Sequence, residues 1–341
     1  MEAKATADRG DEQRLATGTA ANRRLAFLGY GACCAAGCLW GTGFYFGRLA
    51  LDEMSVSHMV LYRFLFASVG ILPVALVHWS DFRFTASEHR LLLLCAFLGV
   101  PLQFLLQFHG LVLTTVSHAS LMVGAMPVLL AAAAAVFSPR GSREERLDLL
   151  GWLALSGSTA GAALVALGGG GESTAQSRSM LTGDLMVLVS LCAALAWILL
   201  SKKLMQAHSP LVVTAYTLLS GTAMLAAWVL IPWLLSPLTH AHVPALPFAH
   251  VSRTAWMALA ASGLLCTAST TLLWNWGIHH VPAARAGVFL NIEPVLGAWL
   301  GVRLLGERLG PYAWIGGCLI LAAAVALTTH AHEPEPAIIL E

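Results

Sequence analysis

One carboxylate lies in an apolar stretch of sequence, where little water is expected around it. Glu293 stands within an apolar run, roughly 283–304, that is long enough to form one membrane-spanning helix. A charge at the centre of such a helix costs about 2.5–3.5 kcal/mol on insertion scales, so an ionisable residue there is expected to have a function. Glu293 is predicted either to bind a substrate amine or to carry a coupling proton. The alternative is that Glu293 only hydrogen-bonds backbone freed by Pro294.

Two prolines occupy the middle of expected helices. Pro127 and Pro294 each remove one backbone hydrogen bond and bend the helix that holds them. Such bends are predicted to act as gating hinges, together with Glu293. The alternative is a static bend that fits the shape of the helix bundle.

Side-chain amides lie at the same depth. Gln103 and Gln107 are four residues apart and therefore share one face of a helix. Polar groups at membrane depth face the interior of a bundle, so these residues are predicted to line a cavity with Asn275 and Asn291. The alternative is that the amides hydrogen-bond neighbouring helices.

Tryptophans are also found inside the apolar runs. Trp40, Trp197 and Trp274 would each offer a cavity a rigid apolar wall and one N–H donor, and the alternative is plain packing or lipid contact. The predicted substrate-binding set is Trp40, Gln103, Gln107, Trp197, Trp274, Asn275 and Asn291.

The remaining ionisable residues carry less chemistry. Arg63 and Arg285 lie near the ends of their apolar runs and are expected to extend to the membrane surface, with attraction of a carboxylate as the alternative. The histidines do not have metal-ligand spacing, so no metal or cofactor is expected. No nucleophile and base converge in the sequence, and the chain is therefore not expected to be an enzyme.

The elements that position these residues follow from composition. The chain of 341 residues is 57% hydrophobic and only 11% charged, whereas soluble domains average about 25% charged residues. Lipid must therefore face much of the apolar surface. The net charge of +1 gives no reason to expect nucleic acid as a partner. Apolar runs of spanning length predict ten transmembrane helices at about 26–49, 58–79, 91–112, 116–137, 149–168, 182–203, 211–235, 255–277, 283–304 and 312–330.

The two ends of the chain are polar. Residues 1–24 and 331–341 are expected to be tails, the first of them disordered. Lys and Arg are more frequent in the loops that share the side of the N-terminus, which places both termini in the cytoplasm.

The helices repeat along the chain. Residues 107–128 align with 274–295 at a constant offset, so that Gly110 meets Gly277 and Pro127 meets Pro294. The result is two five-helix units, 25–170 and 180–330. Because five is odd, the second unit must be inverted in the membrane relative to the first, a construction found in secondary transporters. The fold class is therefore an all-α membrane protein of two inverted repeats.

These residues resemble a known family. The stretch 289–327, with Pro294, Gly306, Glu307 and Gly316, is similar to the end of the EamA-type branch of the drug/metabolite transporter superfamily, as are the Leu-Trp-Gly at 39–41 and Arg63. The first half departs from that pattern, since it has no acidic pair that matches Gly306 and Glu307. The resemblance implies export of a small amino-acid-like metabolite across a bacterial inner membrane.

The expected function is secondary transport by alternating access around a cavity. Its partners would be a small-molecule substrate and membrane lipid, with protons as a candidate coupling ion and homo-oligomerisation left open. An intramembrane enzyme and a non-transporting membrane sensor are the alternatives.

Overall fold

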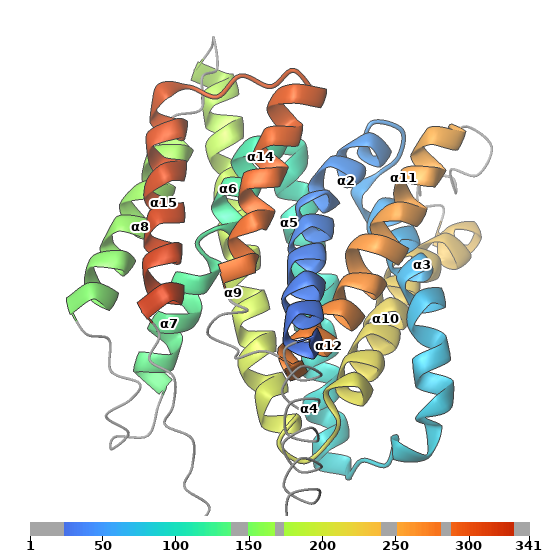
Figure 1. The fold of residues 1–341 in the computed structure, drawn as a ribbon. Coiled ribbons are helices and arrows are strands. Elements are labelled where there is room, and N and C mark those ends of the chain that lie inside the picture. The colour runs from blue at the N-terminus through green and yellow to red at the C-terminus, as the bar shows by residue number, and fades with distance from the viewer. Residues whose placement is uncertain (1–23, 138–148, 168–173, 240–250, 281–287, 331–341) are drawn as a thin grey trace, which may run out of the picture.

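The protein is helical throughout the part that the structure describes. The computed structural model describes residues 24–137, 149–167, 174–239, 251–280 and 288–330, and no strand occurs in these ranges (Figure 1). The expected tails, Arg285 and the loop between the seventh and eighth expected helices lie outside the described residues, apart from the ends of that loop.

The helices follow one another with short connections. The first half contains a helix over 24–41, α2 (Gly43–Leu51), α3 (Val56–Val77), η1 (Trp79–Asp81), α4 (Ala86–Phe97), η2 (Leu98–Leu102), α5 (Gln103–Leu113), α6 (Val116–Val123), α7 (Met126–Phe137) and α8 (Leu149–Leu167). The second half contains α9 (Thr174–Leu204), α10 (Pro210–Thr239), α11 (Arg253–Gly263), η5 (Leu264–Ser269), α12 (Thr270–His280), η6 (Val288–Asn291), α14 (Ile292–Leu304) and α15 (Pro311–His330).

Helix covers most of the described part of every expected span. Six helical stretches of the described chain are long and apolar enough to cross a membrane, and three further apolar helices, 116–129, 149–165 and 311–326, are shorter. Large apolar side chains such as Val77, Leu149 and Trp228 point outward and are well exposed in the isolated chain. Outward apolar surface of this kind is what lipid contact requires, and the chain is a multi-pass membrane protein.

Two helices extend beyond the spans predicted from hydropathy. α9 begins at Thr174, before the predicted start near 182, and α10 continues through Pro237 to Thr239, beyond the predicted end near 235. Hydropathy marks only the part of a helix that lies in lipid, whereas a helix propagates into water at little cost once it is nucleated.

Both prolines that were expected in mid-helix stand in the first turn of a new helix. α6 ends at Val123, and α7 begins at Met126 with Pro127 as its second residue. The 3-10 turn η6 precedes α14, in which Pro294 is the third residue and Glu293 the second. The first turn tolerates proline because its N–H groups have no partner within the helix. The two helices are therefore broken at matching places rather than bent.

A second irregularity also occurs in both halves. η2 and η5 are π-helical turns, within the helical stretches 86–113 and 253–280. Residues 98–102 correspond to 265–269 under the alignment that pairs Gly110 with Gly277. π-Turns are rare and are frequently found at functional sites.

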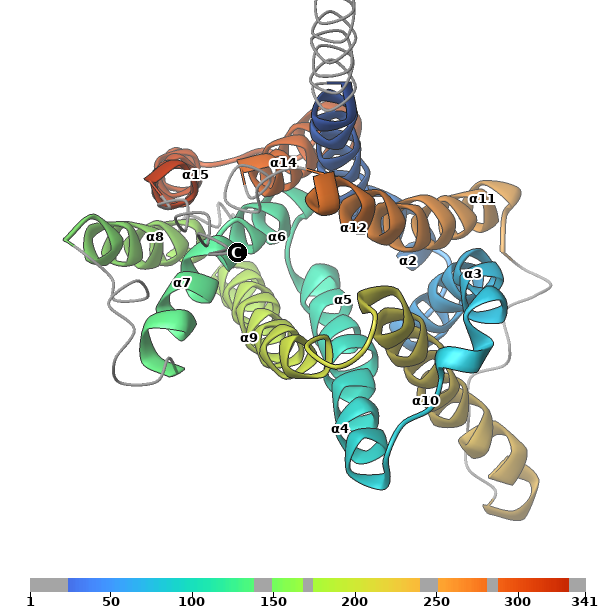
Figure 2. The same ribbon diagram turned by 60° about the horizontal axis from the view of Figure 1, so that its bottom comes forward.

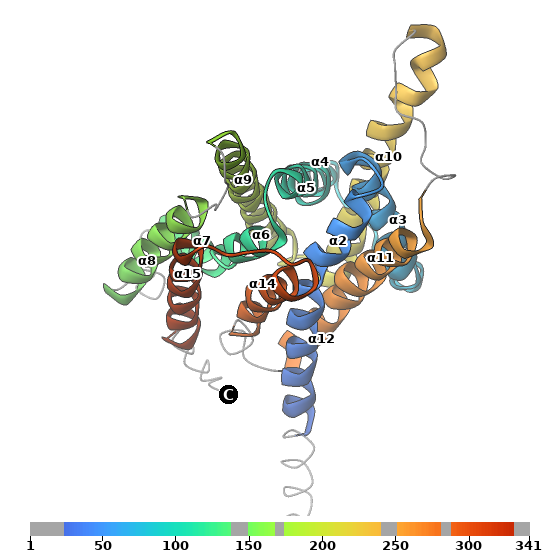
Figure 3. The same cartoon turned by 90° about the horizontal axis from the view of Figure 1, so that it is seen from above.

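Glycines set how closely the helices approach. A Cβ on Gly110 of α5 would stand 2.7 Å from the carbonyl oxygen of Gly183 on α9. A Cβ on Gly277 of α12 would stand 2.5 Å from Cys33 Sγ in the helix 24–41. These matched glycines thus bring the third long helix of each half against the first of the other half, as the views in Figures 2 and 3 also show. α8 and α15 form a separate pair at one edge of the bundle.

Carboxylates from two loops bind the starts of distant helices. Glu307 Oε1 accepts from the Val116 N–H (2.7 Å), and Glu307 Oε2 accepts from the Ser117 N–H (2.8 Å) and hydroxyl (2.6 Å) at the start of α6. Gly306, at φ 68°, ends the preceding helix and so positions Glu307. Glu53 likewise binds Ser252 before α11, and these two hydrogen bonds hold the pKa of Glu53 below its ordinary value.

Replacing Glu307 with alanine is therefore expected to destabilise the protein. The change leaves two N–H groups and one hydroxyl at the start of α6 without their acceptor, at a cost of about 1–2 kcal/mol. Thermal unfolding of the detergent-purified protein, followed by tryptophan fluorescence, measures the loss. Glu307→Gln keeps one acceptor oxygen, so its melting temperature should lie between those of the wild type and Glu307→Ala. An unchanged melting temperature in Glu307→Ala would contradict this role.

Candidate functional site

A buried arginine lies at the centre of the site. The Arg63 side chain on α3 is only 5% exposed and points into the bundle, so the expected position at the membrane surface is wrong. Its Nε–H donates to Thr267 Oγ1 (3.3 Å) in the π-turn η5. Its guanidinium lies over the rings of Phe104 and Phe108, 5.0 and 5.4 Å from their centroids. Cation–π contacts of this kind replace part of the hydration that the arginine gives up.

Glu293 lies on the opposite side of the helix 24–51. A Cβ on Gly41 would stand 3.3 Å from Glu293 Cα, whereas a Cβ on Gly43 would stand 3.7 Å from an Nη of Arg63. Arg63 and Glu293 attract each other electrostatically, but they do not form an ion pair. No hydrogen bond from a described side chain reaches the Glu293 carboxylate. The site thus contains a cation and an anion that are close to each other but do not form an ion pair.

Thr42 separates the two charges. The helix is interrupted at this residue, whose hydroxyl donates to Leu39 O (2.7 Å) and lies 3.1 Å from Cys266 Sγ on η5. The break therefore faces the π-turn that also binds Arg63, so irregular backbone from two helices meets at the site. Backbone of this kind inside a membrane is tolerated only where protein or a cavity surrounds it.

Two of the predicted tryptophans lie together. Trp40 and Trp274 have ring centroids 5.5 Å apart, in a tilted arrangement, and Trp40 is the residue before Gly41. Asn275 follows Trp274, and its buried Nδ2 has no hydrogen-bond partner among the described residues. A buried donor without a partner costs about 1–3 kcal/mol, which is the kind of cost that a bound ligand or water removes.

The other predicted residues lie at a different interface. Gln107 is buried, and Gln103 and Gln107 lie on α5 between Gly99 and Gly110, both of which contact α9. Trp197 of α9 packs directly on Gly99. Gln103 Oε1 and Trp197 Nε1 are a buried acceptor and a buried donor that no described residue satisfies.

The predicted set is therefore divided between two interfaces. Trp40 with Trp274 packs between the helix 24–41 and α12, whereas Trp197 packs between α9 and η2. Asn291 is buried in η6, two residues before Glu293.

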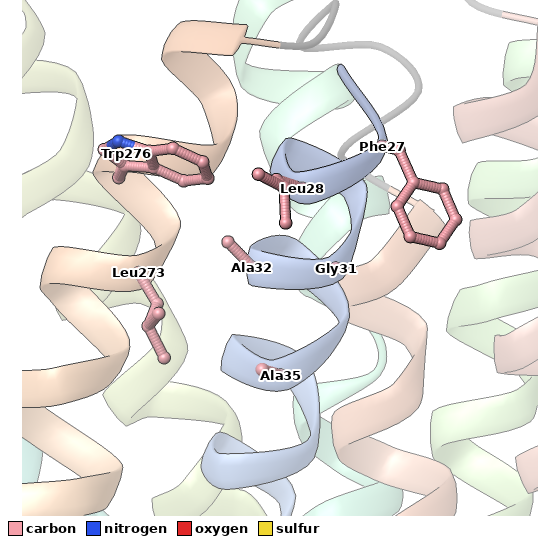
Figure 4. Close-up of a pocket in the computed structure, with 7 residues that line it drawn as sticks. All are labelled: Phe27, Leu28, Gly31, Ala32, Ala35, Leu273 and Trp276. Carbon is pink, nitrogen blue, oxygen red and sulfur yellow. The ribbon is translucent and has the colours of Figure 1, made fainter. Parts of the chain in front are cut away.

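A surface pocket near the N-terminus does not suit a polar ligand. Figure 4 shows it between the helix 24–41 and α12, where it is lined by Phe27, Leu28, Gly31, Ala32, Ala35, Leu273 and Trp276. Its lining is almost wholly apolar, and Phe27 is 77% exposed. In a membrane protein such a surface contacts lipid tails.

The sequence-based prediction missed one buried cluster. Asp184 on α9 accepts from the Thr114 hydroxyl (2.5 Å) and lies 3.0 Å from His118 Nδ1 on α6. Asp184 lies only a few residues inside its apolar run, and its partners are more than sixty residues away. The signal available in the sequence was the carboxylate itself, since an acidic residue inside such a run is rare.

The fold and the buried charges define a multi-pass membrane protein with a polar, irregular centre. Comparison with known proteins agrees with this class: the profile of the EamA-like transporter family matches residues 27–167 and again residues 181–329. The chain belongs to the EamA-like transporter family. The predicted resemblance is confirmed.

Relatives and a solved structure extend the match over most of the chain. An uncharacterized transporter of Archaeoglobus fulgidus is 24% identical over 86% of this chain and 95% of its own length. A protein of Streptantibioticus cattleyicolor named "Probable terminal-alkyne amino-acid exporter" is 26% identical over 84% of this chain and 89% of its own. One crystal structure shares the fold with a TM-score of 0.59 at 18% identity, covering 91% of this chain and 98% of that one.

Proposed function

We propose that this chain is a secondary transporter that exports a small zwitterionic, amino-acid-like metabolite across the bacterial inner membrane by alternating access. The observation that carries the proposal is the separated pair of charges inside the bundle, the buried Arg63 and the partly buried Glu293. A substrate with one carboxylate and one ammonium would neutralise both, with the carboxylate at Arg63 and the ammonium at Glu293.

The energetic argument concerns desolvation. A charged group inside a membrane protein is costly unless it is paired. Among the described residues, Arg63 has one side-chain hydrogen bond and contacts two aromatic rings, and Glu293 has no side-chain hydrogen-bond partner. A zwitterion supplies the two missing partners at once, whereas a monovalent ion would leave one charge buried alone. Trp40 and Trp274 would then provide an apolar wall for its side chain.

Alternating access is supported by features that the two halves share. The breaks before Pro127 and Pro294, the π-turns η2 and η5, and the glycine contacts at Gly110 and Gly277 occur at matching places. These matches support the two inverted five-helix repeats predicted from the sequence, with Pro127 and Pro294 at the hinges. In transporters of such construction, rocking of one repeat against the other exposes the site to either side.

The direction and the topology are part of the same proposal. The positive charges in the loops favour cytoplasmic termini. We propose export rather than uptake because the relative from Streptantibioticus cattleyicolor is named as an amino-acid exporter. Neither the enzyme nor the sensor alternative explains why a cation and an anion would be held apart inside the bundle.

A counterflow screen tests the proposal. The purified protein is reconstituted into liposomes loaded with unlabelled compounds, and entry of the labelled compound is followed. We expect exchange of zwitterionic α-amino acids and slower exchange of their amides and N-acetyl derivatives. Protein-free liposomes are the control. Exchange that is no faster for zwitterions than for singly charged analogues would contradict the proposed substrate class, and the absence of any exchange would contradict transport.

A further inference from the structure

A second pair of ionisable groups is buried away from the Arg63 and Glu293 site. Asp184 on α9 is 0% exposed and His118 on α6 is 1% exposed, and His118 Nδ1 lies 3.0 Å from Asp184 Oδ2. Thr114, at the end of α5, donates its hydroxyl to the other oxygen, Asp184 Oδ1 (2.5 Å). The cluster thus joins three helices. Gly183 makes this possible, because a Cβ there would stand 2.9 Å from the Thr114 nitrogen.

We propose that the His118–Asp184 pair is the site that binds and releases the coupling proton of transport. The proposal rests on the transport function proposed above, and it assigns proton coupling to this pair rather than to Glu293. Histidine is the side chain whose ordinary titration falls between about pH 5 and 8. A hydroxyl or an amide would join the helices equally well, so an ionisable pair at this depth indicates a function beyond packing.

The proton step involves one nitrogen atom. In the neutral imidazole, the Nδ1–H donates to Asp184 Oδ2, and the lone pair of Nε2 is left to bind a proton. Uptake at Nε2 gives an imidazolium paired with the Asp184 carboxylate, and the cluster changes from a net charge of −1 to 0. Release from Nε2 restores the first state. No other reactant is needed.

Among the described residues, no other charged side chain forms a hydrogen bond or a salt bridge with this pair. Glu307 accepts from Val116 and Ser117, and Arg48 on α2 donates to Leu111 O (3.2 Å) and pairs with Asp52 (3.5 Å). His109 on α5 is exposed and bonds its own helix at Leu105 O. α7 and α8 have no charged residue, and the remaining ionisable groups of α9, α14 and α15 are Arg178, Cys192, Lys202, Lys203, Glu293, Arg303, Tyr312, Cys318 and His330. His118 is therefore the titratable partner of Asp184.

α6 connects this pair to the substrate site. The Ser117 hydroxyl donates to Ala298 O of α14 (3.2 Å), and a Cβ on Gly297 would meet the Ser120 side chain. Gly297 lies one helical turn after Glu293 on α14. In one arrangement α6 stays bound to α9 through the His118–Asp184 pair, and in the other it moves together with α14. A change of charge at His118 would favour one arrangement over the other, and so would change the surroundings of Glu293.

Two variants test the proposal in liposomes that exchange a zwitterion in the counterflow screen. In the wild type, an imposed pH gradient should drive accumulation of the substrate. In His118→Gln and Asp184→Asn, that accumulation should be lost, while counterflow without a gradient persists. His109→Gln, an exposed histidine on the adjacent helix, should keep the wild-type response to pH.

Each other outcome overturns the proposal. Full gradient-driven accumulation in either variant would place the proton elsewhere. Loss of counterflow together with accumulation in both variants, in protein that still elutes as a single species, would make the cluster structural.

A measurement without substrate separates this proposal from the transport function. The nitrogen resonance of His118, identified by its absence in His118→Gln, should respond to pH in the purified protein, and that response should change in Asp184→Asn. If His118 responds to pH in this way but the protein transports no compound, the proposed transport function is overturned and the proton site is not. A His118 signal that does not titrate would overturn the proton site.

Discussion

Arg63→Gln is expected to slow exchange of the zwitterionic substrate by about 30- to 1,000-fold. Removing one partner of a buried charge pair costs about 2–4 kcal/mol, and each 1.4 kcal/mol is about a factor of ten. Among the described residues, the Arg63 guanidinium has one side-chain hydrogen bond, to Thr267, and glutamine can also donate a hydrogen bond, although it cannot make the cation–π contacts with Phe104 and Phe108. Counterflow rates of the variant and the wild type measure the effect.

Selectivity distinguishes binding from a general loss of fold. The wild type should prefer an amino acid over its amide, and Arg63→Gln should lose that preference because the carboxylate no longer has a partner. Glu293→Gln should lose the complementary preference for the free amine over the N-acetyl form. Arg63→Lys keeps the charge and should retain part of the preference. An Arg63→Gln protein that still selects the free carboxylate would rule Arg63 out as its partner.

The same Glu293 variant separates its two predicted roles. Substrate binding at Glu293 predicts a change in amine selectivity, with the response to a pH gradient retained in whatever transport remains. Loss of the pH response in Glu293→Gln, with unchanged selectivity, would return the coupling role to this residue.

Gly161→Leu is expected to cost about 3 kcal/mol or more, or to prevent folding. A Cβ on Gly161 of α8 would stand 2.6 Å from the carbonyl oxygen of Gly316 on α15, and a Cβ on Gly316 would stand 2.4 Å from the carbonyl oxygen of Gly161. Both neighbours are backbone, so the contact cannot be relieved by a change of rotamer, and the two helices must separate. The midpoint of thermal unfolding in detergent measures the loss.

Gly157 provides a matched control on the same helix. It lies one turn before Gly161, and a Cβ on Gly157 would meet nothing within 4 Å. Gly157→Leu should therefore unfold at about the wild-type temperature, since leucine is a good helix former. Equal destabilisation by the two leucines would show that helix contact is not the cause.

Much of the fold could be predicted from apolar length alone. Spans near 20 apolar residues located the helices, and the match of Gly110 to Gly277 indicated positions that the structure shows as close helix contacts. Glu293 and Trp40 could be selected because a charge and a tryptophan at membrane depth are unusual residue types for their surroundings. These signals are local, so one sequence is enough to reveal them.

The rest depends on contacts between distant segments. The direction of Arg63 follows from Phe104, Phe108 and Thr267, which belong to two other helices. The pairing of Asp184 with His118 similarly needs α9 and α6 to meet. No residue type marks a π-turn, and proline gave the position of each helix break but not its form, because proline is compatible with both a bend and a first turn.

The π-turns have a consequence for how insertions and deletions would act. A π-turn holds about one residue more than an α-turn, and each residue of an α-helix advances the chain by about 100°. Deleting one residue within 98–102 would therefore let the helix become regular and rotate α5 by about that angle, carrying Phe104 and Phe108 away from Arg63 without changing either ring. The position of Phe104 and Phe108 over Arg63 thus depends on the number of residues that precede them in the helix. The rotational position of residues around the helix, as much as their identity, determines the site.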